Sequence, residues 1–321
     1  MVRIPALVLA TLGLTLTAGA SSAATVRAAG EYQVIDLGTL GGESSYATAI
    51  NDRGEVAGAS AIALNDNTYH GFLWRNGAMI DLGLFDPVDI NNKGQIIGRL
   101  GDEYHAYLWD AGTLTDLGTL GGLFSSAVAI NDRGEVVGMS DTADGQEAAF
   151  LWSKGHMRRL PLNAVTDINN RGQVTGSRPH GEGYHAAVWY RGRVTDLGAG
   201  PFDRGGATGI NERGWVIGLF FSPEYHERGM LWRNGTVTDV GTLGGTFTHL
   251  QTINNRGQIL GISQIPDGNT HPVLWQHGVL TDLSTAGVSA ESDVRDLNNR
   301  GDIAGSIRIV WGVGHAVIYR R

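Results

Sequence analysis

Short apolar segments alternate with turn-forming residues along almost the whole chain, from residue 32 to residue 321. These segments have the length and the period of two that are typical of β-strands, and no long stretch follows the period of a helix. In the representative segment AINDRGEVVG at 129–138, a strand ends at Ile-Asn, a turn follows, and a second strand begins at Glu-Val-Val. The pattern therefore predicts an all-β protein.

This segment occurs seven times in the chain. The copies are AINDRGEVAG at 49–58, DINNKGQIIG at 89–98, AINDRGEVVG at 129–138, DINNRGQVTG at 167–176, GINERGWVIG at 209–218, TINNRGQILG at 252–261 and DLNNRGDIAG at 296–305. The repeated residue is Asn51, Asn91, Asn131, Asn169, Asn211, Asn254 and Asn298. Successive copies lie about 41 residues apart, a period typical of β-propellers, in which each repeat forms one four-stranded blade.

Two further patterns keep step with the first. A strand ending in an aromatic residue recurs at Trp74, Trp109, Trp152, Trp189, Trp232, Trp275 and Tyr319, and a glycine follows each Trp by three residues. Asn76-Gly77 and Asn234-Gly235 are the favoured residues of a tight hairpin, because both central positions need a positive φ. A segment of the DLG type, as in DLGTLGG at 36–42, then ends a fourth strand.

The two ends of the chain complement each other. The last repeat has three strands, and its missing fourth strand is present near the N-terminus as YQVIDLGTL at 32–40. We therefore predict a single seven-bladed β-propeller over residues 32–321, with four antiparallel strands per blade and the last blade closed by the N-terminal strand. A closed ring leaves no free sheet edge for pairing between molecules, so we expect a monomer.

Residues 1–24 have the features of a secretory signal peptide. Arg3 precedes an apolar run, and SSAA at 21–24 offers small residues for cleavage. Residues 25–31 then form a short leader, and nothing after residue 30 is apolar over the length of a membrane span. We expect a secreted, extracellular protein without a membrane span.

Composition excludes several classes of function. The chain has no Cys, which excludes disulfides, a lipoprotein anchor and cysteine chemistry. A net charge of −8 argues against nucleic acid as a partner, because phosphate binding needs a basic surface. No nucleotide-binding, HExxH or nucleophile-elbow motif is present, so we expect no cofactor and favour binding over catalysis.

The third-strand segments resemble a known repeat. HAYLW at 105–109, HAAVW at 185–189, HAVIY at 315–319 and HGFLW at 70–74 are similar to the His-Ala-Phe repeat of the HAF family of bacterial extracellular repeat proteins. Together with the Ile-Asn and DLGTLGG segments, the resemblance covers residues 32–321. It implies an extracellular, propeller-like protein and no particular reaction.

The histidines allow two interpretations. His70, His105, His185, His271 and His315 each precede the Trp or Tyr by four residues, and this repetition favours a structural role. We expect each to bond a backbone carbonyl, a Ser such as Ser140, or the Asp of the DLG segment. The alternative is a metal site in a secreted polysaccharide lyase or hydrolase. His180, His226 and His249 would then be its ligands, because they break the repeat and are expected in loops.

The loops between the second and third strands vary most and are the expected binding site. Four of them end in Tyr-His, with acidic residues nearby. The candidate ligand-binding residues are Tyr69, Tyr104, Tyr184, Tyr225, Glu103, Glu182, Glu224 and Trp311. Aromatic rings beside carboxylates suit sugars or peptides, unless the tyrosines only plug the ends of the blades. We therefore predict a non-catalytic recognition module for an extracellular glycan or protein.

Overall fold

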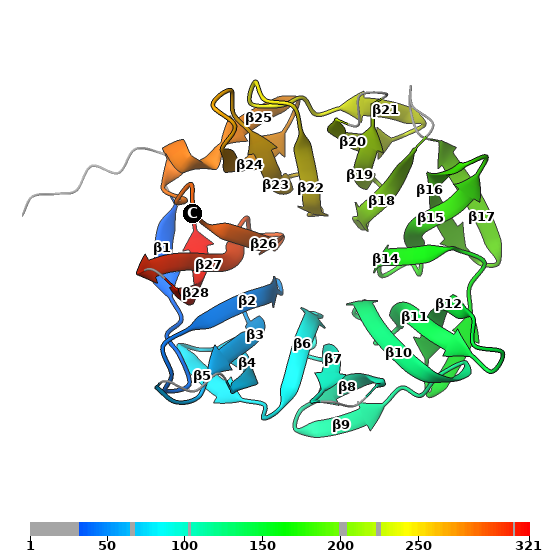
Figure 1. Cartoon of the computed structure of the whole chain (residues 1–321), viewed down its shortest axis with the longest axis horizontal. Coiled ribbons are helices and arrows are strands. Elements are labelled where there is room, and N and C mark those ends of the chain that lie inside the picture. Colours follow the sequence, from blue (N-terminus) through cyan, green and yellow to red (C-terminus); the bar gives the residue numbers. More distant parts are fainter. Residues whose placement is uncertain (1–31, 65–67, 102–103, 199–203, 223–225, 311) are drawn as a thin grey trace, which may run out of the picture.

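The computed structural model describes residues 32–64, 68–101, 104–198, 204–222, 226–310 and 312–321. These residues form seven four-stranded sheets arranged as blades around a common centre (Figure 1). Residues of all seven blades line a cavity there, which we call the central channel. The predicted seven-bladed β-propeller is therefore confirmed. The predicted signal peptide (1–24) and leader (25–31) lie outside the described residues.

Within each blade the strands follow one another outward from the channel. The innermost strands are β2 (Ser45–Ile50), β6 (Phe85–Ile90), β10 (Gly121–Ile130), β14 (Ala164–Ile168), β18 (Gly205–Ile210), β22 (Thr248–Ile253) and β26 (Asp293–Leu297). The second strands are β3 (Val56–Ala61), β7 (Ile96–Leu100), β11 (Val136–Thr142), β15 (Val174–His180), β19 (Val216–Phe221), β23 (Ile259–Gln264) and β27 (Ile303–Val310).

The outer half of each blade has the same order. The third strands are β4 (Tyr69–Arg75), β8 (Ala106–Asp110), β12 (Glu147–Ser153), β16 (Gly183–Tyr190), β20 (Glu227–Arg233), β24 (Thr270–Gln276) and β28 (Val313–Arg320). The fourth strands are β5 (Ala78–Asp81), β9 (Thr113–Asp116), β13 (His156–Arg159), β17 (Arg193–Gly198), β21 (Thr236–Asp239), β25 (Val279–Asp282) and, for the last blade, β1 (Gln33–Asp36). We number the blades 1 to 7 from β2 onward.

Blade 7 closes the ring as predicted. Strand β1 pairs with β28 in a sheet of order β1-β28-β27-β26, with Val34 opposite Tyr319. A 3₁₀ helix, η1 (Leu283–Ala286), connects blades 6 and 7. No helix among the described residues is long and apolar enough to cross a membrane.

The hydrophobic core is divided into layers between neighbouring blades. Leu108 of blade 2, for example, belongs to one cluster with Phe150 and Trp152 of blade 3. The repeated third-strand aromatic residue contributes in each case, and Tyr319 of blade 7 is completely buried. No blade encloses a core of its own, so each blade depends on its neighbours.

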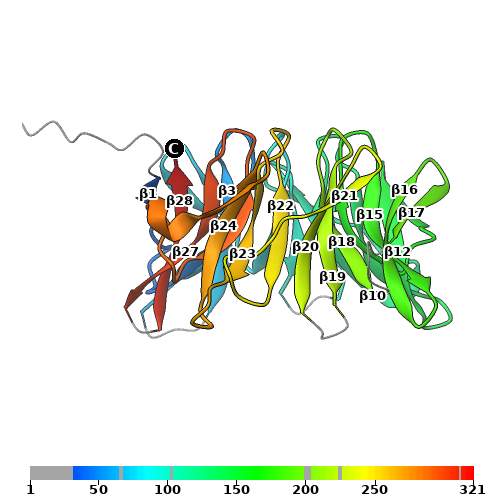
Figure 2. The same cartoon turned by 90° about the horizontal axis from the view of Figure 1, so that it is seen from above.

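The repeat residues define two faces of the disc (Figure 2). The first strand ends at the repeat Asn, so these Asn turns lie on one face, which we call the turn face. The second strand runs back, so the loops between strands two and three lie on the opposite face, the loop face. The tight hairpins at Asn76-Gly77 and Asn234-Gly235 have positive φ at both residues, as predicted.

The repeat Asn joins each blade to the next. Its Oδ1 accepts the amides of its own turn and so caps that turn; for Asn51 these are the amides of Arg53 and Glu55, at 3.0 Å. Its Nδ2 donates to the main-chain carbonyl of the equivalent Asn in the next blade. The seven bonds join Asn51 to Asn91, Asn91 to Asn131, Asn131 to Asn169, Asn169 to Asn211, Asn211 to Asn254, Asn254 to Asn298 and Asn298 to Asn51.

The residue after the repeat Asn forms a second ring. The amide of Asp52 donates to the side-chain oxygen of Asn92 at 2.8 Å, and the amide of Asn299 donates to Asp52 in the same way at 2.8 Å. Equivalent bonds connect the other neighbouring blades. The turn residues therefore cap the backbone of the neighbouring blade as well as their own, and this surrounds a polar cavity of about 170 Å³ at the channel.

Candidate functional site

The loop face carries a ring of His–Asp pairs, one in each of five blades. In each pair the Nδ1 of the repeated third-strand His lies 2.7–3.0 Å from the Asp of the DLG segment. The pairs are His70–Asp81, His105–Asp116, His185–Asp196, His271–Asp282 and His315–Asp36. The Asp of DLG was one of the partners expected for these histidines, and that prediction is confirmed.

These pairs hold the fourth strand against the third. The Asp81 carboxylate also accepts the amide of Gly83 at 2.7 Å, at the point where the fourth strand ends. Burial raises the pKa of this carboxyl, but the hydrogen bonds from the Gly83 amide and from His70 together lower it by more. The pKa of Asp81 therefore lies below its ordinary value. In blade 5 the same link is made by Arg228 and Asp239, at 2.7 Å. An arginine in the same place supports a structural role for the repeated His.

The tyrosines of the loop face are exposed. The exposed fraction is 39% for Tyr69, 69% for Tyr104 and 48% for Tyr184, so these side chains do not plug the ends of their blades. Glu182 is also exposed. The other candidates, Glu103, Glu224, Tyr225 and Trp311, lie outside the described residues.

A further exposed aromatic residue, Tyr46, was not predicted. Its ring centroid lies 5.9 Å from that of Tyr69, and 41% of its surface is exposed. Tyr46 lies in the innermost strand β2, whereas Tyr69 begins the third strand β4. The signal in the sequence is the pattern SYATAI, in which Tyr46 falls between two buried positions of a strand and is therefore expected to be exposed. The two rings form a tilted aromatic pair on the loop side of blade 1.

The three histidines of the metal alternative do not form one group. His226 is exposed, and His249 lies in β22 rather than in a loop, with its Nδ1 2.6 Å from the Glu227 carboxylate. The hydrogen bond that the Glu227 carboxylate accepts from His249 raises the pKa of this histidine, against the effect of burial. His180 ends β15, also not in a loop, and its ring stacks on His185 at 3.7 Å between centroids. Its neighbours are therefore residues of its own blade.

Three aspartates on innermost strands, Asp89, Asp167 and Asp296, have no counterpart among the sequence-based candidates. Asp89 accepts the amide of Ile90 in its own strand, at 2.7 Å, and the amide of Ile130 in the next blade, at 3.0 Å. Asp167 and Asp296 make the equivalent pairs of bonds. Each carboxylate therefore ties its own blade to the following one, which carries a small residue at this position, Ala129, Gly209 or Ala49.

These three aspartates have raised pKa values. Burial is the main cause that raises the pKa of Asp89 to about 7. The charges of Asp296 and Asp167 add to this effect, and the hydrogen bond from the Ile130 amide opposes it. Burial likewise raises the pKa of Asp167 to about 6. The three aspartates are only partly exposed. Ionisation of these groups is therefore disfavoured in the folded state.

This arrangement predicts a folding stability that falls as the pH rises from about 4 to about 7. In that range the unfolded chain has an ionised Asp89, while the folded protein keeps it protonated and so binds more protons. The melting temperature should therefore be higher at pH 5 than at pH 7.5. Asp89→Ala, which installs the residue of blades 1 and 3, should make this difference smaller.

The control for the pH prediction is Asp86→Ala. Asp86 lies in the same strand, β6, but its side chain is 48% exposed and faces Arg99. Melting curves of the wild type and both variants should be recorded in buffers between pH 5 and pH 7.5. If Asp89→Ala keeps the full pH dependence of the wild type, Asp89 is not the titrating group.

Comparison with known proteins supports the fold. No protein-family model and no curated protein matches the chain. Among solved structures, the β-propeller domain of the Trilobed protease from Pyrococcus furiosus has a TM-score of 0.60 at 13% identity, over 86% of this chain and 95% of that one. Virginiamycin B lyase from Staphylococcus aureus has a TM-score of 0.57 at 9% identity, over 91% of this chain and 100% of that one.

A third structure matches over part of its length. Pyrococcus horikoshii acylaminoacyl peptidase has a TM-score of 0.55 at 12% identity, over 82% of this chain but 49% of that one. Likeness at such low identity shows a common propeller architecture and does not carry an activity across. Function has to be inferred from the residues of this chain.

Proposed function

We propose that this protein is an exported, non-catalytic recognition module that binds an extracellular glycan through its loop face. The observation that carries the proposal is the exposure of Tyr69, Tyr104 and Tyr184 in three different blades of that face. A flat, exposed ring with a hydroxyl can stack on the apolar face of a sugar while polar groups beside it bond the sugar hydroxyls. The resemblance to extracellular HAF-repeat proteins supports export.

The charges of the loop face narrow the class of glycan. The exposed acidic residues of its loops include Asp144, Glu147, Glu182 and Asp267. A polyanionic chain would meet like charges here, which costs binding free energy unless cations are supplied. We therefore propose an uncharged or amino-sugar polysaccharide, whose repeated units suit tyrosines repeated from blade to blade.

The repeated histidines do not argue for catalysis. Each His of the five pairs is bonded within its own blade, and the pairs are distributed around the ring. A catalytic set would have to bring several such groups to one reacting centre. Binding without turnover is the function that this arrangement supports.

The test is calorimetric titration of the purified protein with uncharged, amino-sugar and acidic oligosaccharides. We expect saturable binding of one of the first two classes and loss of at least about 90% of the affinity in the double variant Tyr104→Ala, Tyr184→Ala, since a lost stacking residue costs about 1–2 kcal/mol. The matched control is Tyr190→Ala, because Tyr190 ends the same strand as Tyr184 at the turn face. Binding only to a protein ligand, or product release over time, would contradict the proposal.

A further inference from the structure

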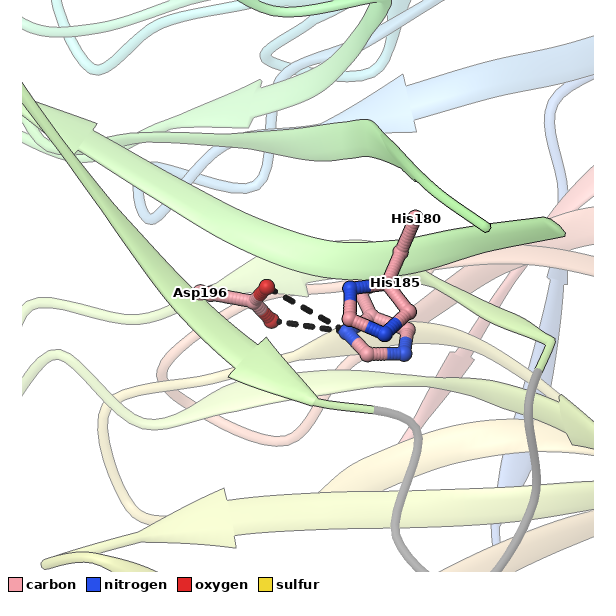
Figure 3. A group of neighbouring side chains, drawn as sticks. All are labelled: His180, His185 and Asp196. Carbon is pink, nitrogen blue, oxygen red and sulfur yellow. Dashed lines mark hydrogen bonds and ion pairs between the residues drawn. The ribbon is translucent and has the colours of Figure 1, made fainter. Parts of the chain in front are cut away.

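Blade 4 adds a second imidazole to its His–Asp pair. The rings of His180 and His185 are stacked, with an interplanar angle of 15° (Figure 3). The Nδ1 of His185 lies 3.0 Å from one oxygen of Asp196 and 3.2 Å from the other. The three residues each offer one possible ligand atom, and these atoms lie within 4.8 Å of one another. Among the described residues, no other three such side chains meet in this way.

Strand register explains why the three side chains meet. Arg178 is opposite His185, and His180 is opposite Gly183 at the end of a hairpin. Directly opposite residues lie on the same face of a sheet, and so do residues two apart in one strand. His180 is two residues from Arg178, which is opposite His185, so His180 and His185 share one face. Asp196 is opposite Ala187, which lies two residues beyond His185, and so it faces the same way.

Of blades 1, 4, 6 and 7, only blade 4 has this second imidazole. In blades 1, 6 and 7 the residues opposite the repeated His are Ser60, Ser263 and Ile307. Two residues further along the chain, the position of His180 is occupied by Ile62, Ile265 and Ile309. The His–Asp pair is therefore part of the scaffold, whereas His180 is an addition that the scaffold does not need.

We propose that His180, His185 and Asp196 bind one divalent transition-metal ion such as Zn²⁺. Two imidazole nitrogens and one carboxylate oxygen form a ligand set that Zn²⁺ commonly uses, with the remaining position open to water. The ion would replace the direct contact between the Nδ1 of His185 and the carboxylate of Asp196. Tetrahedral coordination needs ligand atoms about 3.3 Å apart, which a small rotation of the exposed His180 side chain can provide.

The neighbouring groups are compatible with this site. Asp196 keeps its orientation through the Gly198 amide, which donates to its Oδ1 at 2.7 Å. Arg178 lies 3.9 Å from the Oδ2 of Asp196, with its side chain 44% exposed, so it can turn toward solvent when a cation arrives. The site lies on the loop face, outside the channel, and it goes beyond the proposed glycan binding because no tyrosine of that proposal is a ligand. It also departs from the expectation, based on motifs alone, that the protein has no cofactor.

The experiment is titration of the metal-free protein with Zn²⁺ by calorimetry and with Co²⁺ by visible absorption. We expect one tight equivalent in the wild type. His180→Ile, which installs the residue of blade 1, should weaken binding by about 100-fold or more, since a lost ligand costs at least as much as a lost supporting residue. The control is His70→Gln, which removes a repeated His from a pair without a second imidazole and should leave the one equivalent intact.

The outcomes separate this proposal from its alternatives. Binding of about five equivalents, or equal weakening in both variants, would mean that the His–Asp pairs bind metal without His180. No binding to the wild type, or unchanged binding in His180→Ile, would also overturn the proposal. Circular dichroism confirms that each variant is folded. Glycan titration in the presence of chelator distinguishes a failure of this site from a failure of the proposed function.

Discussion

Asn131→Ala is expected to lower the free energy of unfolding by about 3–5 kcal/mol, because it leaves one buried backbone carbonyl and two partly buried backbone amides without these partners. The Asn131 side chain is 4% exposed and makes four hydrogen bonds. It accepts the amides of Arg133 and Glu135 and donates to the Glu135 carboxylate and the Asn169 carbonyl. Thermal melting and denaturant titration measure the loss, which should appear as a fall in melting temperature of about 10 °C.

Asn131→Asp separates the two roles of this side chain. The aspartate keeps an oxygen for the turn amides but cannot donate to Asn169, and it brings a negative charge to the Glu135 carboxylate. We expect this variant to be at least as destabilised as Asn131→Ala. If Asn131→Asp is as stable as the wild type, the bond between blades contributes little and the turn cap alone explains the repeat Asn.

Gly138→Ala is expected to destabilise the protein by about 3 kcal/mol or more, through a clash in the interior of blade 3. A Cβ at Gly138 would overlap sterically with the carbonyl oxygen of Ser126, and it would lie 2.7 Å from the ring of Phe150. The bulge in β10 between Ala127 and Ala129 accompanies this close approach. Each of the seven blades has a Gly at this position and a register shift in its first strand.

The control for the second prediction is Gly206→Ala. Gly206 also lies in a strand, β18, but a Cβ there would meet nothing within 4 Å. Its replacement should change stability by less than about 0.5 kcal/mol, or raise it through a less flexible unfolded chain. Denaturant midpoints of both variants measured side by side provide the comparison. Equal stability of the two variants would show that blade 3 relaxes around the added methyl group.

The candidate site could be predicted only in part. The spacing of the repeats placed each third-strand His beside a DLG segment, and hence the Asp partner of His70 and His185 was foreseeable. Tyr69, Tyr104 and Tyr184 are exposed, as the proposed binding role requires. The sequence did not indicate that His180 would stack on His185, because a hairpin register had to be known first.

His180, His226 and His249, the ligands of the metal alternative, show most clearly what the sequence could not predict. They were grouped because each breaks the repeat, a criterion that carries no distance. His249 instead pairs with Glu227 of the preceding blade, and His180 meets two residues of its own blade. Departure from a repeat identifies residues that the scaffold does not need, but it cannot say which of them are neighbours.

The amino-acid sequence alone determined the number of blades, the four strands of each blade and the closure by β1, because these follow from local patterns repeated along the chain. Strand period, turn residues and repeat length are all properties of residues close in sequence. The tertiary structure alone decided which polar groups meet between blades, such as the Nδ2 of Asn51 and the carbonyl of Asn91, or Asp89 and the Ile130 amide. Those partners lie a whole repeat apart, and only the curvature of the closed ring and the bulge in each first strand bring them within hydrogen-bond distance.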